Sequence, residues 1–439
     1  MLRKAKLVLG MRGARTALRT FATVNVVAAV ICVLPGRGVA QTAGHLDPGF
    51  GTGGVVTTSF GMGNPLGAFE QANGGIVVVS TFSEPTTAQT AIGLLRYTST
   101  GQPDATFGAN GRTVTTFPGG VNVTPIGFAQ QSDGAFVVAV QVVPGDMGLA
   151  RFTANGVLDT TFGIAGTVTI NIPGSDVPTV LLLQPNGQIV LAGVVGSGRK
   201  TVTNNTVLLR FNSNGTPDST FGSNGTVLTP GQGPSSVALL SNGDYLVLGA
   251  ETGGTEFGPT GALLATVTPG PVVIAATNGF ASAVQPDGES IMVSSVSGAG
   301  RGTSDAEAVL FSETGTADSS FITTPFTYDA PGTVLTTLNN RSTADAVAIQ
   351  SNGQILVGGG LTGSAAEPPP GVFGLARLNA NGSLDSTFGS GGIVTTGFPG
   401  SANMSSLLVE TNGDIVAVGS VFNRSTSVES IGIARYLGQ

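Results

Sequence analysis

The sequence predicts an all-β protein, a seven-bladed β-propeller of four-stranded blades. Three observations predict it. Two sequence patterns recur along the chain, the repeated unit has the length of one propeller blade, and the two ends of the chain complete each other. Residues 41–439 are expected to form the propeller, and residues 1–40 a signal peptide.

The first pattern is an apolar run, an Asn-Gly or Asp-Gly pair, and a second apolar run, as in GAFEQANGGIVVVS and AVAIQSNGQILVGG. Such a pair between two β-rich runs predicts a hairpin, because both central residues of the favoured turn need positive φ. The sequence therefore predicts seven hairpins, 45 to 65 residues apart, with turn glycines Gly74, Gly134, Gly187, Gly243, Gly288, Gly353 and Gly413.

The second pattern follows each hairpin and contains an apolar strand that ends in Arg, a Gly turn, and then Asp, two small residues, Phe and Gly. Clear copies are GLLRYTSTGQPDATFG, GLARFTANGVLDTTFG, VLLRFNSNGTPDSTFG and GLARLNANGSLDSTFG, and AVLFSETGTADSSF is a weaker one. A further short apolar run follows. The apolar runs add up to four strands in about 45 to 60 residues, the size of one blade.

The ends of the chain indicate how the array closes. The segment after residue 41 begins in mid-unit with HLDPGFG, and the chain stops in mid-unit at IGIARYLGQ. Joined, they form one complete copy of the second pattern. A solenoid would instead have unlike, polar repeats at its two ends. The sequence therefore predicts a ring closed by N-terminal and C-terminal segments that share one blade.

The two patterns resemble the delta-60 repeat, most clearly in the LDxxFG-type elements at residues 158–163 and 384–389. The resemblance covers nearly all of residues 46–437 and is lost around residues 255–269. That family is found in bacterial exported proteins and is assigned to β-propellers. The resemblance implies this fold and export, and it implies no particular activity.

The repeated polar residues are expected to be structural. Arg and Asp lie eight residues apart on either side of a tight turn, so Asp can bind Arg or the turn amides, and Arg435 should pair with Asp47. A calcium or substrate ring is the alternative, but Asp residues spread one per blade do not converge on one ion. The positions concerned are Arg96, Arg151, Arg210, Arg377 and Arg435, with Asp47, Asp104, Asp159, Asp218, Asp318 and Asp385.

The repeated phenylalanines are expected to be wedges between blades rather than a ligand platform, since aromatic burial supplies much of a β core. They are Phe50, Phe107, Phe162, Phe221, Phe321 and Phe388.

The N-terminal segment predicts export. A basic stretch precedes an apolar run at residues 21–34, and Gly38, Val39 and Ala40 follow as a cleavage site. That run has 14 residues, whereas a spanning helix needs about 20, so a membrane span is not expected. The sole cysteine, Cys32, lies in this segment. Whether the product stays in the periplasm, on the cell surface or free in the medium is left open.

Composition excludes several chemistries. Seven of the 18 basic residues lie in the first 40 positions, which hold no acid, so the rest has 11 basic and 25 acidic residues, a formal charge of −14. Nucleic acid is therefore not an expected partner. With His45 as the sole histidine, ordinary zinc and copper sites, a Cys-His pair and a Ser-His-Asp triad are not expected. The sequence singles out no catalytic, cofactor-binding or metal-binding residue.

Two functions remain. The first is a monomeric, non-enzymatic scaffold that binds a protein or a surface polysaccharide through blade loops, whose lengths vary, notably at the insertion at residues 364–371. The second is a carboxylate-dependent polysaccharide hydrolase or lyase. Its candidates are unrepeated acids in expected loops, none of them paired by spacing: Glu84, Asp146, Asp176, Glu251, Asp305, Glu307 and Asp329.

Overall fold

A computed structural model describes most of the chain after residue 41. The described residues are 42–59, 63–83, 89–197, 203–231, 233–240, 242–249, 253–267, 276–284, 289–297, 304–311, 318, 321, 333–336, 343–361 and 371–439. The predicted signal peptide, Gly288 and the insertion at residues 364–371 lie outside them, apart from Gly371. No helix within these ranges is long and apolar enough to cross a membrane.

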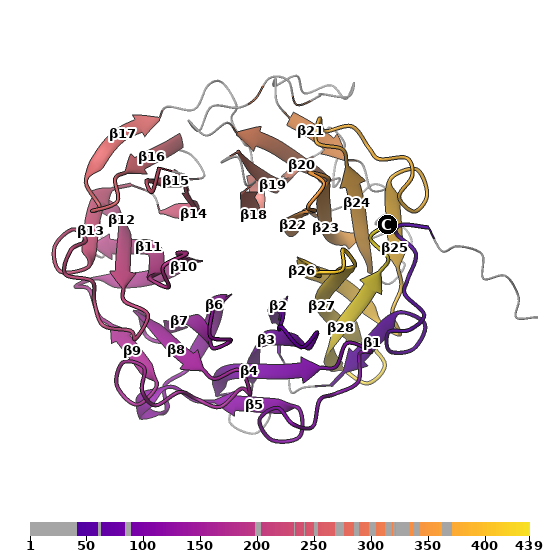
Figure 1. The fold of residues 1–439 in the computed structure, drawn as a ribbon, viewed down its shortest axis with the longest axis horizontal. Helices are drawn as coiled ribbons and strands as arrows, with labels where there is room; N and C mark the ends of the chain where they lie inside the picture. The colour runs from indigo at the N-terminus through magenta and orange to yellow at the C-terminus, as the bar shows by residue number, and fades with distance from the viewer. Residues whose placement is uncertain are drawn as a thin grey trace, which may run out of the picture. The chain divides into compact units, whose positions relative to one another are not determined.

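The described strands form seven four-stranded antiparallel sheets (Figure 1). Sheet 1 contains β2 (Pro65–Glu70), β3 (Ile76–Ser83), β4 (Thr90–Tyr97) and β5 (Arg112–Thr115). Sheet 2 follows a 3-10 turn (Pro118–Gly120) and contains β6 (Val123–Gln130), β7 (Phe136–Val142), β8 (Asp146–Phe152) and β9 (Thr167–Ile170). Sheet 3 contains β10 (Ser175–Leu183), β11 (Ile189–Ser197), β12 (Thr203–Phe211) and β13 (Thr226–Pro230). Sheet 4 contains β14 (Pro234–Leu239), β15 (Tyr245–Gly249), β16 (Gly253–Phe257) and β17 (Leu263–Val267).

The remaining three sheets follow in chain order. Sheet 5 contains β18 (Ala276–Val284), β19 (Ser290–Ser297), β20 (Ser304–Phe311) and β21 (Thr333–Thr336). Sheet 6 contains β22 (Ala346–Ile349), β23 (Ile355–Leu361), β24 (Val372–Leu378) and β25 (Ile393–Thr396). Sheet 7 contains β26 (Ser401–Val409), β27 (Ile415–Asn423), β28 (Val428–Tyr436) and β1 (Val55–Thr58).

Sheet 7 joins the two ends of the described chain. Its fourth strand, β1, pairs antiparallel with β28, with Val55 opposite Ala434 and Thr58 opposite Ile431. In Figure 1 the indigo strand β1 runs beside the yellow strand β28. The prediction that the N-terminal and C-terminal segments share one four-stranded unit is therefore confirmed.

Each sheet contacts the next one through its first strand. The contacts run from β2 to β6, β10, β14, β18, β22 and β26 in turn, and β26 contacts β2. Among the described residues, buried apolar side chains fill six of the seven junctions, all except that between sheets 4 and 5. One such cluster joins sheet 7 to sheet 1 through Val416, Ile431, Ile76 and Tyr97, all nearly or fully buried. The hydrophobic effect therefore stabilises the last-to-first contact as it does the other five.

The predicted hairpins are present, but their turn differs from the expected one. The turns between first and second strands that are described in full, in sheets 1, 2, 3, 6 and 7, each contain five residues, such as 71–75 between β2 and β3. Gly74 N–H donates to Gln71 O and Gln71 N–H donates to Gly75 O, both at 2.8 Å. The six described turn glycines have φ between 75° and 90°, whereas the preceding Asn or Asp residues do not have positive φ. The expectation of positive φ at both positions was wrong, because only Gly is left-handed in this longer turn.

Candidate functional site

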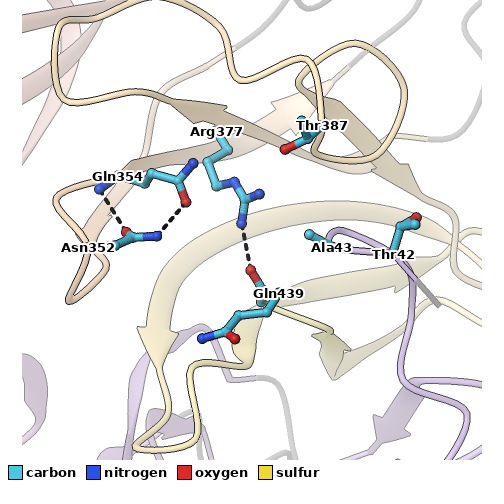
Figure 2. Close-up of a pocket in the computed structure, with 8 residues that line it drawn as sticks. Thr42, Ala43, Asn352, Gln354, Arg377, Thr387 and Gln439 are labelled. Atoms are coloured by element: carbon cyan, nitrogen blue, oxygen red, sulfur yellow. Dashed lines mark hydrogen bonds between the residues drawn. The ribbon is translucent and has the colours of Figure 1, made fainter. Parts of the chain in front are cut away.

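A pocket lies where the two ends of the described chain meet sheet 6 (Figure 2). Gly44 N–H donates to Leu437 O (2.8 Å) and Leu437 N–H donates to His45 O (2.9 Å), which fixes both segments. The exposed ring of His45 lies 2.8 Å, through Nδ1, from the Thr42 hydroxyl. The pocket has a volume of about 460 Å³ and is lined by Thr42, Ala43, Asn352, Gln354, Arg377, Thr387, Gly438 and Gln439. Arg377 is the sole charged side chain in that lining.

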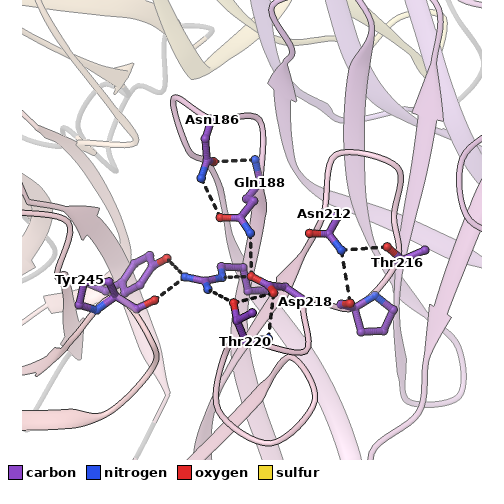
Figure 3. Close-up of polar contacts among 10 residues, drawn as sticks. Asn186, Gln188, Asn212, Thr216, Asp218, Thr220 and Tyr245 are labelled. Atoms are coloured by element: carbon purple, nitrogen blue, oxygen red, sulfur yellow. Dashed lines mark hydrogen bonds and ion pairs between the residues drawn. The ribbon is translucent and has the colours of Figure 1, made fainter.

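Arg377 belongs to a unit that several sheets repeat, and sheet 3 shows it clearly (Figure 3). Phe211, after Arg210, forms an antiparallel bridge with Pro217, before Asp218. This bridge explains the eight-residue spacing, because it places the two charged side chains side by side. Arg210 Nε donates to Asp218 Oδ2 at 2.7 Å. Asp218 Oδ1 accepts from the backbone N–H and the hydroxyl of Thr220, at 3.0 and 2.8 Å.

The same guanidinium reaches the following sheet. Arg210 Nη1 donates to the main-chain oxygen of Pro259 and to the Tyr245 hydroxyl at 3.1 Å, both in sheet 4. Its Cζ atom lies over the ring of Phe221, 4.5 Å from the ring centre. One arginine therefore joins its own turn, a buried aromatic ring and the neighbouring sheet.

Four further units repeat this geometry. In each, Arg binds Asp and donates through Nη1 to a main-chain oxygen one sheet ahead: Arg96 to Ala154 (3.1 Å), Arg151 to Ser213 (2.9 Å), Arg377 to Gly438 (2.6 Å) and Arg435 to Ser99 (2.6 Å). The last unit crosses from sheet 7 to sheet 1. Arg435 Nε donates to Asp47 Oδ2 at 2.9 Å, which confirms the predicted pair.

The repeated phenylalanines complete the junctions. All six are 0 or 1% exposed. Phe162 lies against the next sheet's turn at Gly215, where a Cβ atom would come within 2.9 Å of the ring. The following Gly163 donates its N–H to Asn214 O, also in the next sheet, at 2.9 Å. The prediction that these rings are wedges between repeats, rather than a ligand platform, is confirmed.

Four of the repeated aspartates have a lowered pKa: Asp104, Asp159, Asp218 and Asp385. The Thr106 hydroxyl lowers the pKa of Asp104, and its amide and Arg96 lower it further, against the opposing effect of burial. Burial raises the pKa of Asp218, but hydrogen bonds from Thr220 and the Arg210 charge outweigh it, so the net shift is downward. A carboxylate with lowered pKa and committed oxygens does not act as a general acid at neutral pH.

Two of the unrepeated acids come together at the junction of sheets 2 and 3. Asn171 Nδ2 donates to Asp146 Oδ1 (2.8 Å), and the adjacent Ile172 N–H donates to Asp176 Oδ2 (2.7 Å). Asp176 is fully buried and its Oδ1 has no hydrogen-bond partner. Burial raises the pKa of Asp176, and the nearby Asp146 charge adds to that effect despite the Ile172 amide.

The other unrepeated acids give no cluster that can be described. Asp305 and Glu307 lie on β20. Glu84, Glu251 and Asp329 are outside the described residues. Across the described ranges, no group of three or more His, Cys, Asp or Glu residues could hold a metal ion.

Sequence reasoning missed two parts of the repeated unit. A threonine two residues after Asp donates to it in four copies, at Thr106, Thr161, Thr220 and Thr387. A glutamine at the start of the hairpin turn accepts from Arg in three copies, at Gln71, Gln131 and Gln350. Both recur at fixed positions in the sequence, so the signal was available.

Four segments of the chain match a family model described as "Domain of unknown function (DUF5122) beta-propeller", at residues 71–107, 131–162, 184–221 and 350–388. These four segments are similar to DUF5122 β-propeller repeats. Each matched segment begins at the first residue of a hairpin turn and ends at the repeated phenylalanine that follows the Arg-Asp pair. The DUF5122 pattern therefore coincides with the residues that join successive sheets.

Solved structures that resemble this chain have little sequence identity with it. A Dyadobacter fermentans protein of unknown function is 10% identical with a TM-score of 0.44, covering 88% of this chain and 99% of that one. YCF48 bound to D1 peptide is 10% identical with a TM-score of 0.46, covering 91% of this chain and 100% of that one. The α-L-arabinofuranosidase Arb93A of Fusarium graminearum, in complex with an iminosugar inhibitor, is 8% identical with a TM-score of 0.44. The match covers 90% of this chain and 98% of that one. No curated protein matches the chain.

Proposed function

We propose that the chain is an exported, non-enzymatic propeller scaffold that binds a protein or surface polymer on one end of its sheets. In this proposal residues 1–40 are a signal peptide, the repeats are of the delta-60 type, and the seven sheets are blades of one closed ring. The cyclic contacts and the Arg435 unit support closure. In this proposal the repeated polar residues hold the sheets together, and the loops bind the partner.

The observation that carries this proposal is a difference between two sets of connections in the sheets. Counted between the strand bounds, five residues separate the first and second strands of every sheet. The loops between second and third strands lie at the opposite end, because neighbouring strands are antiparallel. These loops range from three residues, between β7 and β8, to ten, between β23 and β24. Variable loops on a constant scaffold are where binding sites are usually placed.

Apolar side chains are exposed at the end of the sheets that carries the loops between second and third strands, as others are at the opposite end. Val143 is 47% exposed in the β7–β8 loop, and Val177 is 40% exposed near the start of β10. Phe422, near the end of β27, and Val428, at the start of β28, are 42% and 40% exposed. These four side chains give a partner apolar contacts that the scaffold itself does not use.

Charged substitutions test which end binds. In a sedimentation assay with the cell-envelope fraction of the producing cells, Val143→Asp with Phe422→Asp should reduce retention of the protein at least about tenfold, since burying a charge at an apolar contact is costly. The matched control is Val157→Asp with Ile164→Asp in the connection between β8 and β9, at the opposite end of the sheets, which should change nothing. Equal effects from both pairs would place binding elsewhere.

The acid pair favours the second candidate, a carboxylate-dependent polysaccharide hydrolase or lyase. A buried acid of raised pKa beside a second carboxylate is the pairing that glycoside hydrolysis uses. Asp176 is closed to solvent, however, so a polysaccharide does not reach it in this conformation. Release of reducing sugar from envelope polysaccharide, abolished by Asp176→Asn, would establish this function in place of the scaffold.

A further inference from the structure

The glutamine at the start of the hairpin turn links three groups across a junction. Gln71 Oε1 accepts from Arg96 Nη1 at 3.0 Å, and Gln71 Nε2 donates to Ala154 O of the next sheet at 2.8 Å. Gln131 makes the same two contacts, at up to 3.5 Å, with Arg151 and with Ser213 O of sheet 3. Gln350 also accepts from its arginine, Arg377, at 3.3 Å, but its Nε2 donates to a different carbonyl, Gly413 O in the hairpin turn of sheet 7, at 3.5 Å. In these three sheets the amide therefore acts as both acceptor and donor, whereas Gln184 Oε1 at the same position of sheet 3 has no hydrogen-bond partner.

Sheet 7 has Glu410 at this position instead. Its side chain is 3% exposed, and Oε2 has no hydrogen-bond partner. Oε2 lies 3.7 Å from Arg435 Nη1, which donates to Ser99 O of sheet 1. An ionised carboxylate can accept from Arg435, but it has no hydrogen with which to replace the amide donor.

The charged groups around Glu410 are mostly acidic. Arg435 on β28 is the nearby cation, and it is already paired with Asp47. Glu70, at the end of β2, accepts from the Thr411 backbone and hydroxyl, and Asp414 ends the hairpin turn. Burial raises the pKa of Glu410 to about 7, with Arg435 opposing this and Glu70, Asp414 and Asp47 adding to it.

We propose that Glu410 makes the contact between sheet 7 and sheet 1 a proton-controlled latch. With a proton, the carboxyl group can donate across the junction as the glutamines do, and the contact is tight. Without it, a buried carboxylate lies among three other acids and the contact is weakened. The junctions that carry Gln71, Gln131 and Gln350 have no such dependence, so the latch is specific to the place where the two chain ends are joined.

The direction of the pH effect follows from the two states of Glu410. Its pKa is 4.5 as an ordinary glutamate and about 7 when folded. A raised folded pKa contributes stability that is fully present below the unfolded pKa and is lost as pH rises through the folded one. The latch is therefore closed at about pH 4.5 and opens progressively up to about pH 8.

Glu410→Gln, measured against the unchanged full chain, tests the latch. The variant keeps the donor at every pH, so its Tm should equal that of the parent near pH 4.5 and exceed it by about 3–5 °C at pH 8. Amide hydrogen exchange should localise the difference, with residues 97–102 and 410–414 exchanging at least about fivefold faster in the parent at pH 8. A Tm difference that is the same at both pH values would overturn the proposal.

Gln350→Glu is the matched control, because it places the same acid in the junction of sheets 6 and 7. It should introduce a second loss of Tm between pH 4.5 and 8. If either variant fails to fold, infrared titration of the parent's protonated carboxyl band decides. A protonated carboxyl that titrates near pH 7 is expected, and the absence of any such carboxyl above pH 6 would contradict the latch.

Discussion

Replacement of Arg377 by methionine is expected to lower the free energy of unfolding by about 3–5 kcal/mol, because removing one partner strands a buried charge. The side chains of Arg377 and Asp385 are 5% and 7% exposed. The change also removes the bonds from Arg377 to Gln350 and to Gly438. Urea unfolding at pH 7 measures the loss.

A matched variant shows whether the loss of stability comes from the broken junction or from the removal of any arginine. Arg112 is exposed at the start of β5, so Arg112→Met should change the unfolding free energy by no more than about 0.5 kcal/mol. Adding Asp385→Asn to Arg377→Met should recover part of the loss, since the stranded charge is removed. A loss below about 1 kcal/mol for Arg377→Met would mean that the unit does not hold the sheets together.

Phe162→Ala is expected to lower the free energy of unfolding by about 3–5 kcal/mol, the usual cost of truncating a buried aromatic side chain. Phe162 is fully buried between sheets 2 and 3, and the Arg151 guanidinium lies 5.3 Å from its ring centre. Chemical denaturation monitored by circular dichroism gives the value. Sheets that unfold cooperatively should show a single transition with a lower midpoint.

The control for Phe162 lies two residues further along the same turn. Ile164 is 84% exposed, so Ile164→Ala should change stability by no more than about 0.5 kcal/mol. Similar losses at both positions would contradict the assignment of the repeated phenylalanine as a wedge.

Much of the fold was predictable because each repeat is one local unit with its own pattern. The eight-residue spacing from Arg to Asp already indicated a tight turn, and the complementary ends indicated the pairing of Arg435 with Asp47. The turn type was not predictable, because an Asn-Gly pair also fits a longer turn in which Gly alone is left-handed.

The candidate sites were less predictable, because they depend on contacts between sheets. Asp146 and Asp176 are 30 positions apart, and only the packing of β8 beside β10 brings them to the same pair of residues, Asn171 and Ile172. Glu410 is an ordinary acid in sequence. Its position becomes distinctive once the glutamines of the other junctions are seen to donate across them.

The most direct test of the account is a crosslink between the two ends of the chain. Ser59 Oγ, just after β1, lies 3.1 Å from Ser430 Oγ on β28, and the chain after residue 40 contains no cysteine. The variant Ser59→Cys with Ser430→Cys should form a disulfide on mild oxidation, seen as a mass loss of about 2 Da and a shift on non-reducing gels, since the distance suits the bond. Ser59→Cys with Ser213→Cys should not. Failure of the first pair to crosslink in folded protein would contradict the shared sheet and the closed ring.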